Sequence, residues 1–356
     1  MIYVHVPFCR SFCTYCDFYS ERACPTEAYV NEVCAEAEAR KDEIAATRDV
    51  DTLYIGGGTP SVLPLPYLAR IADACGGRRY EEWTVEVNPD DITPEYARGL
   101  RELGVNRVSM GVQSLDDGML RWMNRRHDAD GARKAFRLLR EAGFDNISVD
   151  VIFGVGGMSP EMLEATVREL LEWRPEHISA YQLSVEEGSA LGRMAREGRY
   201  TELPDEACEA QYLLLCRLLA AAGYEHYEIS NWALPGHRAI HNSAYWTRKP
   251  YVGIGPGAHS LRMVTAGGGE PSGVTQPQRR SRENGRSRMA SASCNIRSWN
   301  SEELSGWTAT SEVLTEEEIR EERIMLGLRT AEGLPEYGRI PEEKWFVADD
   351  IISSLI

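Results

Sequence analysis

A tight group of potential metal ligands stands near the start of the chain. Cys9, Cys13 and Cys16 follow the spacing C-x3-C-x2-C, and Phe18 occupies the place where a fourth close ligand could have followed. Thiolates favour soft metals and iron–sulfur clusters. Three cysteines on one loop can hold three irons of a [4Fe–4S] cluster and leave the fourth iron open. A zinc site would need a distant fourth donor such as His5.

Two carboxylates stand inside stretches that are otherwise apolar and β-branched. Glu86 lies within V-E-V and Asp150 within V-D-V. Because the strands of a parallel barrel are covered on both faces, a carboxylate there needs a partner or a ligand. A structural pair with an arginine is the alternative to ligand binding. Arg125, in MNRRH, can grip a ligand carboxylate with two N–H bonds, or it forms a surface ion pair.

A glycine run, GGGTP at 56–60, directly follows a predicted strand. Glycines let the backbone approach a ligand closely and offer its N–H and C=O groups. The run fits neither the dinucleotide-binding nor the phosphate-binding glycine pattern, so nucleotide phosphates are not the first expectation.

The elements that must position these residues alternate along the chain. Amphipathic helices are predicted between short strands, and in the segment 159–173 Ser159 is the expected N-cap and Pro160 the first helical residue. The expected buried positions in this helix and the one before the fifth strand are Leu163, Val167, Leu170 and Leu171, and Ala132, Phe136 and Leu139. Strands are predicted at 2–8, 51–57, 83–89, 105–113, 147–154 and 177–184.

The junctions between helix and strand repeat. The segments 101–109 and 140–148 each have a glycine suited to a left-handed helix cap, and 221–230 is a weaker third copy. Strand–helix–strand units with short loops predict parallel pairing through right-handed crossovers. Six such units predict an α/β fold, an incomplete (β/α)6 barrel, with its working site at the carboxyl ends of the strands.

Composition limits the class of protein. The chain has 356 residues and a net charge of −16, from 55 acidic and 39 basic residues. This acidity argues against a broad nucleic-acid surface, which needs clustered Lys and Arg. No apolar run has the length of a membrane span, and MIYVHVPF lacks the features of a signal peptide. Nine cysteines, scattered beyond the first three, favour a reducing compartment, so a cytoplasmic location is expected.

Changes in composition predict four regions. Residues 1–195 form the partial barrel, and 196–264 form an extension of it. Residues 265–293 are rich in Gly, Ser, Arg and Gln, which predicts a disordered insertion. Residues 294–356 are expected to form a small, mainly helical C-terminal domain, with a charged helix within 315–334. This last domain is short, so we expect either a reduced domain or a truncated chain.

Taken together, the motifs resemble the radical S-adenosylmethionine (SAM) superfamily. YVHVPFC, CDF, GGGTPS, EVNP, RVSMGVQS, MNRRH, DVIFG and GIGPGAHS narrow the resemblance to the branch of oxygen-independent coproporphyrinogen III oxidases and HemW-type haem chaperones. The resemblance implies a [4Fe–4S] cluster on Cys9, Cys13 and Cys16 whose open iron binds SAM. One electron, from a donor such as a flavodoxin or ferredoxin, would split SAM into methionine and a 5′-deoxyadenosyl radical. The residues implied to line SAM are Tyr3, Tyr15, Gly57, Gly58, Thr59, Glu86, Gln113, Arg125, Asp150 and Ser184.

Two features of the resemblance bear on function. The oxidases carry a further cysteine where this chain has Phe18, as HemW-like chains do. HNSAYW matches the H-N-x-x-Y-W motif associated with haem binding, which implies haem contacts by His241, Asn242, Tyr245 and Trp246. A packed structural loop is the alternative reading of this motif. The resemblance thus implies a chaperone that delivers haem to an apo-haemoprotein, and an acceptor at a membrane surface is one expectation. The alternatives are a coproporphyrinogen III oxidase, which decarboxylates two propionates, and a zinc-stabilised binding protein.

Overall fold

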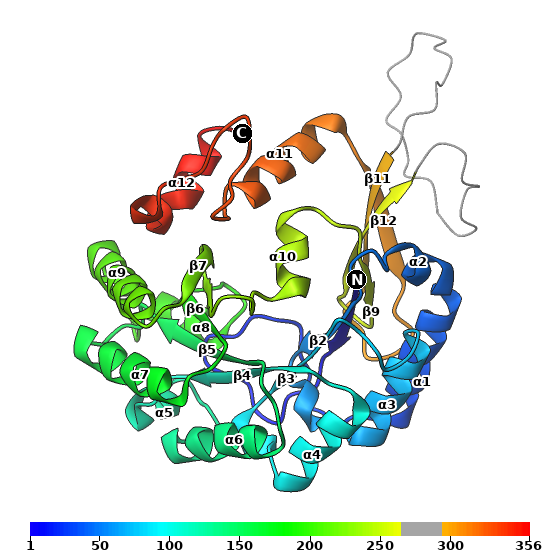
Figure 1. Cartoon of the computed structure of the whole chain (residues 1–356), viewed down its shortest axis with the longest axis horizontal. Helices are drawn as coiled ribbons and strands as arrows, with labels where there is room; N and C mark the ends of the chain where they lie inside the picture. The colour runs from blue at the N-terminus through cyan, green and yellow to red at the C-terminus, as the bar shows by residue number, and fades with distance from the viewer. Residues whose placement is uncertain (265–293) are drawn as a thin grey trace.

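The computed structural model describes residues 1–264 and 294–356. Its main element is a nine-stranded sheet with the order β7-β8-β6-β5-β4-β3-β2-β1-β9. Figure 1 shows the helices on an outer arc around these strands, with a gap in the arc where the helix α10 lies. The predicted insertion at 265–293 lies outside the described residues.

Six parallel strands form the centre of the sheet, as the sequence predicts. Each is paired with its sequence neighbour, so the strands run in one order from β1 to β6. Their bounds are β1 (Ile2–Val6), β2 (Thr52–Gly57), β3 (Glu82–Val87), β4 (Arg107–Gln113), β5 (Ile147–Phe153) and β6 (His177–Gln182). The predicted incomplete barrel is confirmed.

Helices cover the outer face of these strands. Ser159 caps α7, since its hydroxyl accepts a hydrogen bond from the Met162 N–H, and Pro160 is the first helical residue, as predicted. The predicted buried positions of α6 and α7 are buried, except Leu171, which is half-buried. The helices of this half are α1 (Glu27–Ala39), α2 (Lys41–Ala46), α3 (Leu65–Ala74), α4 (Pro94–Leu103), α5 (Asp117–Trp122), α6 (Ala129–Glu141), α7 (Pro160–Trp173) and α8 (Ala190–Arg196).

The repeated junctions behave as expected in two of three cases. Gly104 and Gly143 have φ angles of 107° and 87°, a left-handed conformation that glycine adopts without a steric penalty. The third copy also has its glycine, Gly223 at 88°. Its strand, β7 (Glu225–Glu228), nevertheless differs, because it forms a hairpin with β8 (Asn231–Ala233), and β8 pairs antiparallel with β6. A tight turn reverses the chain there, so no parallel crossover follows.

The remaining elements flank the barrel. The helix α9 (Asp205–Ala221) precedes β7, α10 (Ile240–Trp246) follows β8, and β9 (Val252–Ile254) pairs parallel with β1. The structure adds two strands to the region expected to be mainly helical. A three-stranded antiparallel sheet is formed by β10 (His259–Val264), β11 (Cys294–Asn300) and β12 (Ala309–Leu314), and α11 (Glu316–Gly327), the 3-10 segment η3 (Glu342–Val347) and α12 (Ala348–Ser353) follow it. Among the described residues, no helix is both long and apolar enough to cross a membrane.

Candidate functional site

A cavity of about 710 Å³ lies at the carboxyl ends of the parallel strands. Most of the residues that the sequence singles out line it together, although they come from distant parts of the chain. Tyr3, His241, Tyr245 and Trp246 are not among the lining residues. Those that line it are Cys9, Cys13, Tyr15, Cys16, Gly57, Gly58, Thr59, Glu86, Gln113, Arg125, Asp150, Ser184 and Asn242.

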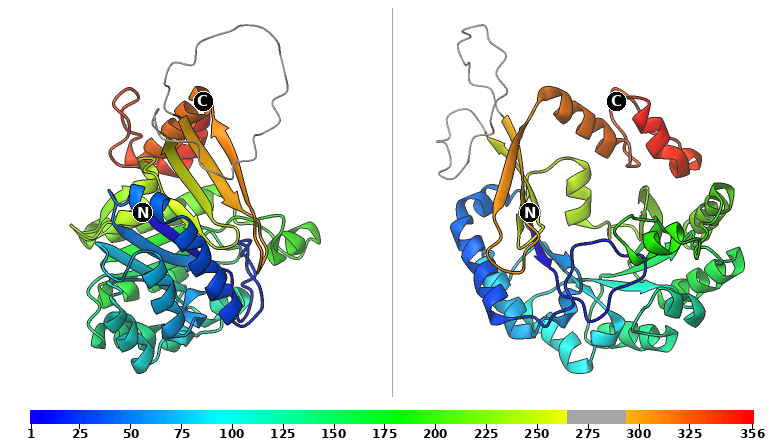
Figure 2. Two further views of the ribbon diagram at one scale, coloured as in Figure 1. Left: turned by 90° about the vertical axis from the view of Figure 1, so that its right-hand side faces the viewer. Right: turned by 180° about the vertical axis from the view of Figure 1, so that it is seen from behind.

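The three cysteines lie on the long loop between β1 and α1. In the right-hand view of Figure 2 this loop, in dark blue, crosses the inner side of the arc of strands. Backbone bonds fix it: the Cys9 N–H donates to the Glu21 carbonyl at 3.0 Å, and the Thr14 N–H donates to the Met123 carbonyl at 3.0 Å. The loop is thus attached to the barrel rather than free in solvent.

The separation of the sulfur atoms bears on which metal they can hold. One tetrahedral zinc ion would bring sulfur ligands to about 3.8 Å from one another, from Zn–S bonds of about 2.3 Å. All three cysteines are described, yet their sulfurs do not all lie within 4.8 Å of one another. In an iron–sulfur cube each thiolate binds its own iron, so the cysteine sulfurs stand farther apart. The loop therefore offers one thiolate to each of three irons of a cluster.

His5 is not available as the fourth zinc ligand of the alternative reading. Its Nδ1 is 3.0 Å from the Tyr3 hydroxyl, and its Nε2 is 3.0 Å from the Tyr19 carbonyl oxygen. Burial also lowers the pKa of His5. Both ring nitrogens already have partners, and Tyr3 is thereby placed behind the cavity wall.

Arg125 connects the cysteine loop to the barrel. Its guanidinium donates to Cys13 Sγ at 3.2 Å and to the Gly111 carbonyl at 2.7 Å. Although burial disfavours its charge, the neighbouring Tyr15 and Cys13 raise the pKa of Arg125. Its Nε is buried and has no hydrogen-bond partner among the described residues. A cation beside a thiolate favours the charged sulfur that binds metal.

Burial favours the protonated form of two of the three thiols. Burial raises the pKa of Cys9, with a partly opposing hydrogen bond to the Thr59 hydroxyl at 3.4 Å. Burial likewise raises the pKa of Cys16 to about 11. Cluster binding must therefore release these protons.

The glycine run forms a tight turn beneath the cysteines. Gly57 has a φ of 116°, and its N–H donates to Glu86 Oε2 at 3.1 Å. A Cβ on Gly58 would lie 3.0 Å from Cys9 Sγ and 3.0 Å from the Phe8 carbonyl oxygen. Only glycine allows the turn to lie this close to the cysteine loop.

The two carboxylates lie on the cavity floor without cationic partners. Within the described chain neither Glu86 nor Asp150 has an Arg, Lys or His nitrogen within 4.0 Å, so the structural ion pair is not formed. Glu86 accepts from the Tyr54 hydroxyl at 2.8 Å, and Asp150 accepts from the Ser109 hydroxyl at 3.2 Å. Burial raises the pKa of Glu86 to about 7 and also raises that of Asp150. Such carboxylates suit a ligand with hydroxyl or ammonium groups.

Two further predicted residues stand at strand ends. Gln113 has a φ of 68°, which is rare for a residue with a side chain, and it lies at an irregularity in the pairing of β4 with β5. Strain of this kind is concentrated at functional sites. The exposed Ser184 donates to Glu186 Oε1 at 2.8 Å. Both side chains face the cavity.

The structure divides the HNSAYW motif on α10 between the cavity and the protein interior. Asn242 lines the cavity, whereas His241 is fully buried. His241 Nδ1 is 2.8 Å from the Thr52 hydroxyl, and its Nε2 is 3.1 Å from the Tyr245 hydroxyl. Burial lowers the pKa of His241 to about 3, so the ring is neutral. The Trp246 ring lies under the Arg329 guanidinium at 5.8 Å.

Sequence reasoning missed several cavity residues. Arg107 is 1% exposed at the start of β4, where its Nη1 is 3.5 Å from the Thr84 hydroxyl and its Nε has no partner among the described residues. Ser109 follows it on the same face of the strand, and Tyr181 stands at the end of β6. The sequence contained a signal for Arg107 as a cavity residue. It is a charged residue inside an apolar strand, the same pattern that singled out Glu86.

Comparisons with known proteins agree with this geometry. The family model of the radical SAM superfamily matches residues 3–170. The chain is 36% identical to the haem chaperone HemW of Lactococcus lactis over 263 residues, which is 72% of this chain and 68% of the relative. It is also 36% identical to the haem chaperone HemW of Bacillus subtilis over 266 residues, 72% of this chain and 69% of the relative.

A solved structure has the same fold. Coproporphyrinogen III oxidase (HemN) from Escherichia coli, described as a radical SAM enzyme, matches with a TM-score of 0.68 and 19% identity, over 99% of this chain and 81% of that one. At this identity the match establishes the fold alone. The sequence relationships over more than two thirds of each HemW chain are more specific. The chain therefore belongs to the radical SAM superfamily and, within it, to the HemW family.

Proposed function

We propose that this chain is a haem chaperone, which binds haem beside a SAM-coordinating [4Fe–4S] cluster and passes it to an apo-haemoprotein. The observation that carries the proposal is the position of Asn242. This residue of the HNSAYW motif lines the same cavity as Cys9, Cys13 and Cys16. The family relationship to proteins named haem chaperones supports it.

The cavity residues fit the two cofactors that radical SAM proteins use. Cys9, Cys13 and Cys16 would hold the cluster, which supplies one electron to bound SAM. Arg125 would stabilise the Cys13 thiolate and can meet the SAM carboxylate. The unpaired carboxylates on the floor suit the ammonium and hydroxyl groups of SAM. The remaining residues proposed to contact SAM are Tyr15, Gly57, Gly58, Thr59, Glu86, Gln113, Asp150 and Ser184. Tyr3 lies behind the cavity wall, where it contacts His5, so a direct contact with SAM is not proposed for it.

The mouth of the cavity suits a flat apolar ligand. Phe12 and Phe18 lie on the cysteine loop, line the cavity and are 46% and 75% exposed. Covering such rings contributes roughly 1.5–3 kcal/mol for each fully buried side chain. Phe18 would thus make an apolar contact with the ligand at the position where the oxidases have a cysteine.

Iron ligation by His241 requires a local opening of α10. A neutral imidazole is a suitable axial ligand, but both of its nitrogens are occupied by Thr52 and Tyr245 in the closed form. Haem binding through this ring must therefore break the hydrogen bond of the nitrogen that takes the iron, whereas the other nitrogen can keep its partner. The measured affinity is then reduced by the fraction of molecules in the open form. Tyr245 and Trp246 would cover the porphyrin face after opening.

Haem titration of the cluster-loaded protein tests the proposal. We expect saturable binding with a Soret band, which His241→Ala abolishes or shifts. His259→Ala is the control, since this exposed histidine on β10 lies outside the motif. Wild-type protein without saturable binding, at any cluster occupancy, would reject the proposal.

Turnover assays separate the chaperone from the oxidase. With SAM, a reductant and coproporphyrinogen III under anaerobic conditions, a chaperone forms no protoporphyrinogen. Product formation at a rate above that of a Cys13→Ser variant would favour the oxidase. The proposed partners are an electron donor such as a flavodoxin or ferredoxin, and an acceptor haemoprotein at a membrane surface. Transfer of bound haem to an added apo-haemoprotein would test the second step.

A further inference from the structure

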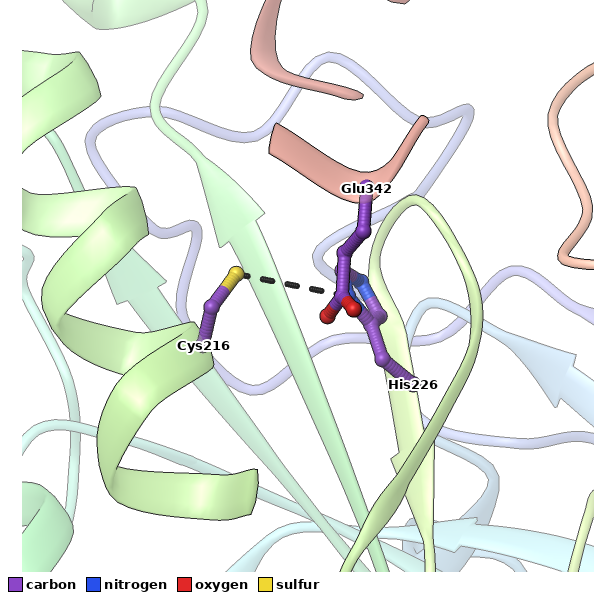
Figure 3. A group of neighbouring side chains, drawn as sticks. All are labelled: Cys216, His226 and Glu342. Carbon is purple, nitrogen blue, oxygen red and sulfur yellow. Dashed lines mark hydrogen bonds and ion pairs between the residues drawn. The ribbon is translucent and has the colours of Figure 1, made fainter. Parts of the chain in front are cut away.

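A second group of potential metal ligands lies outside the cavity, where the C-terminal segment contacts the barrel extension. Cys216 of α9, His226 of β7 and Glu342 of η3 point toward one another (Figure 3). The His226 Nδ1 is 4.0 Å from Cys216 Sγ and 2.8 Å from Glu342 Oε1. One donor atom from each residue lies within 4.8 Å of the other two.

The imidazole ring of His226 is held in one orientation. It stacks on Trp232 with centroids 4.0 Å apart and planes 13° apart, and its other side meets Trp345 edge-on at 4.2 Å. Its Nε2 is 3.2 Å from the Ile229 carbonyl oxygen. The Tyr212 hydroxyl is 3.4 Å from the same nitrogen, but it already donates to the Ile229 carbonyl at 2.8 Å. Because a carbonyl oxygen only accepts hydrogen bonds, Nε2 is the donor and carries a hydrogen. This arrangement, a ring N–H bonded to a carbonyl, is the one that fixes metal-binding histidines.

The position of the ring hydrogen determines what Nδ1 can do. In the neutral ring, Nδ1 has a lone pair directed at the carboxylate oxygen of Glu342. Two acceptors 2.8 Å apart require a proton or a metal cation between them. A proton between Nδ1 and the Glu342 oxygen would join these two atoms but would not involve Cys216 Sγ. A cation placed among the three atoms uses the thiolate, the imidazole and the carboxylate together.

We propose that Cys216, His226 and Glu342 bind a zinc-type divalent cation, with water at the fourth position. One sulfur, one nitrogen and one oxygen ligand match the donors that Zn²⁺ accepts. Binding forms bonds to all three atoms and releases the Cys216 thiol proton to solvent, together with any proton on Nδ1.

The geometry requires only small movements. Ligand atoms around tetrahedral zinc are about 3.3–3.6 Å apart for these donor pairs, from bond lengths of about 2.0–2.3 Å. The observed separations of 2.8 and 4.0 Å lie on either side of that range. The Glu342 side chain is 55% exposed, so it is free to adjust and gives the ion access, whereas the His226 side chain is 4% exposed. The bound ion would attach the C-terminal segment to α9 and β7.

Zinc binding by the full-length, cluster-reconstituted protein tests the proposal. Loading the cluster first occupies Cys9, Cys13 and Cys16, which would otherwise bind zinc. After chelator washing, we expect one Zn²⁺ per chain by titration calorimetry and elemental analysis. X-ray absorption at the zinc edge should show one sulfur among otherwise nitrogen and oxygen ligands. Three sulfurs would place the zinc on the cysteine loop and overturn the proposal.

Matched variants separate ligation from folding. Cys216→Ser and Glu342→Gln should each weaken zinc binding by about 100-fold or more, since even outer partners of a metal contribute 10–100-fold. Cys208→Ser, on the same helix, and Glu343→Gln, the next residue of η3, should leave the affinity unchanged. Zinc should raise the melting temperature of the wild type and both controls but not of the ligand variants. Equal zinc affinity in all four variants would overturn the assignment, as would a wild type that binds no zinc.

Discussion

Glu86→Gln should stabilise the cluster-free protein at alkaline pH while weakening SAM binding. The half-buried carboxylate has no cationic nitrogen within 4.0 Å in the described chain, and desolvation raises its pKa from 4.5 to about 7. A raised folded-state pKa means that the folded chain holds a proton that the unfolded chain has lost. The contribution of Glu86 to stability is therefore full below pH 4.5 and is lost progressively as the pH rises to about 7. Glutamine mimics the protonated form at every pH.

The magnitude follows from the size of the shift. A difference of 2.5 units between 7 and 4.5 corresponds to about 3.4 kcal/mol at roughly 1.4 kcal/mol for each unit. Water in the open cavity screens part of this, so we expect a gain of about 2 kcal/mol at pH 8 and under about 1 kcal/mol at pH 5. Glutamine can accept from the Gly57 N–H as Glu86 does, and its amide N–H can donate to the Tyr54 oxygen, which reverses the direction of the present bond.

Urea denaturation of the wild type and Glu86→Gln at pH 5 and pH 8 measures the difference in their free energies of unfolding. Equal m-values for the two proteins show that this difference reflects stability. SAM titration of the reconstituted proteins gives the second readout, where the variant should bind more weakly. A variant that is equally destabilised at both pH values would refute the reasoning about the buried charge. A stabilised variant with unchanged SAM affinity would refute the role of Glu86 in binding.

Three further changes probe other parts of the argument. Gly58→Ala should lower the iron and sulfide content after anaerobic reconstitution, because its Cβ would lie 3.0 Å from Cys9 Sγ; full cluster loading would contradict this. Arg125→Lys loses the planar guanidinium, which can donate two hydrogen bonds to the SAM carboxylate. It should weaken SAM binding by about 10-fold or more in calorimetry. Arg121→Lys, at an exposed position, should leave SAM binding unchanged. Ser159→Ala removes the N-cap of α7 and should lower the free energy of unfolding by about 1 kcal/mol, with no change in cluster content.

Local signals predicted the barrel well. The six parallel strands, the N-cap of α7 and the glycine caps at Gly104 and Gly143 each depend on residues close in sequence. The convergence of the cysteines, the glycine run and the two carboxylates on one cavity then follows, because parallel strands end at the same edge.

The features that the sequence did not reveal depend on distant contacts. The tight turn after β7 reverses the chain, although the helix end before it resembles the two parallel junctions. His241 belongs to a ligand-like motif, yet Thr52 and Tyr245 hold it in the interior. The pairing of β11 with β10 spans residues that are far apart in the chain. Periodicity within one segment contains no information on these partners.

The two edge strands of the nine-stranded sheet are not paired with each other, and α10 packs beside them against β2 and β3. The strands β7 and β9 are the two edges of the nine-stranded sheet, and in the part of the chain that the structure describes no ladder connects them. Figure 1 shows α10 on the side of this gap. Its first turn is held by the Glu82 carboxylate at the start of β3, which accepts the N–H groups of Ile240 and His241 at 2.8 and 2.9 Å. Displacement of this short helix would break its bonds to Thr52 and Glu82 and leave the pairing between strands intact. If the proposed function holds, the ligand has a route beside this helix that leaves the cysteine loop in place.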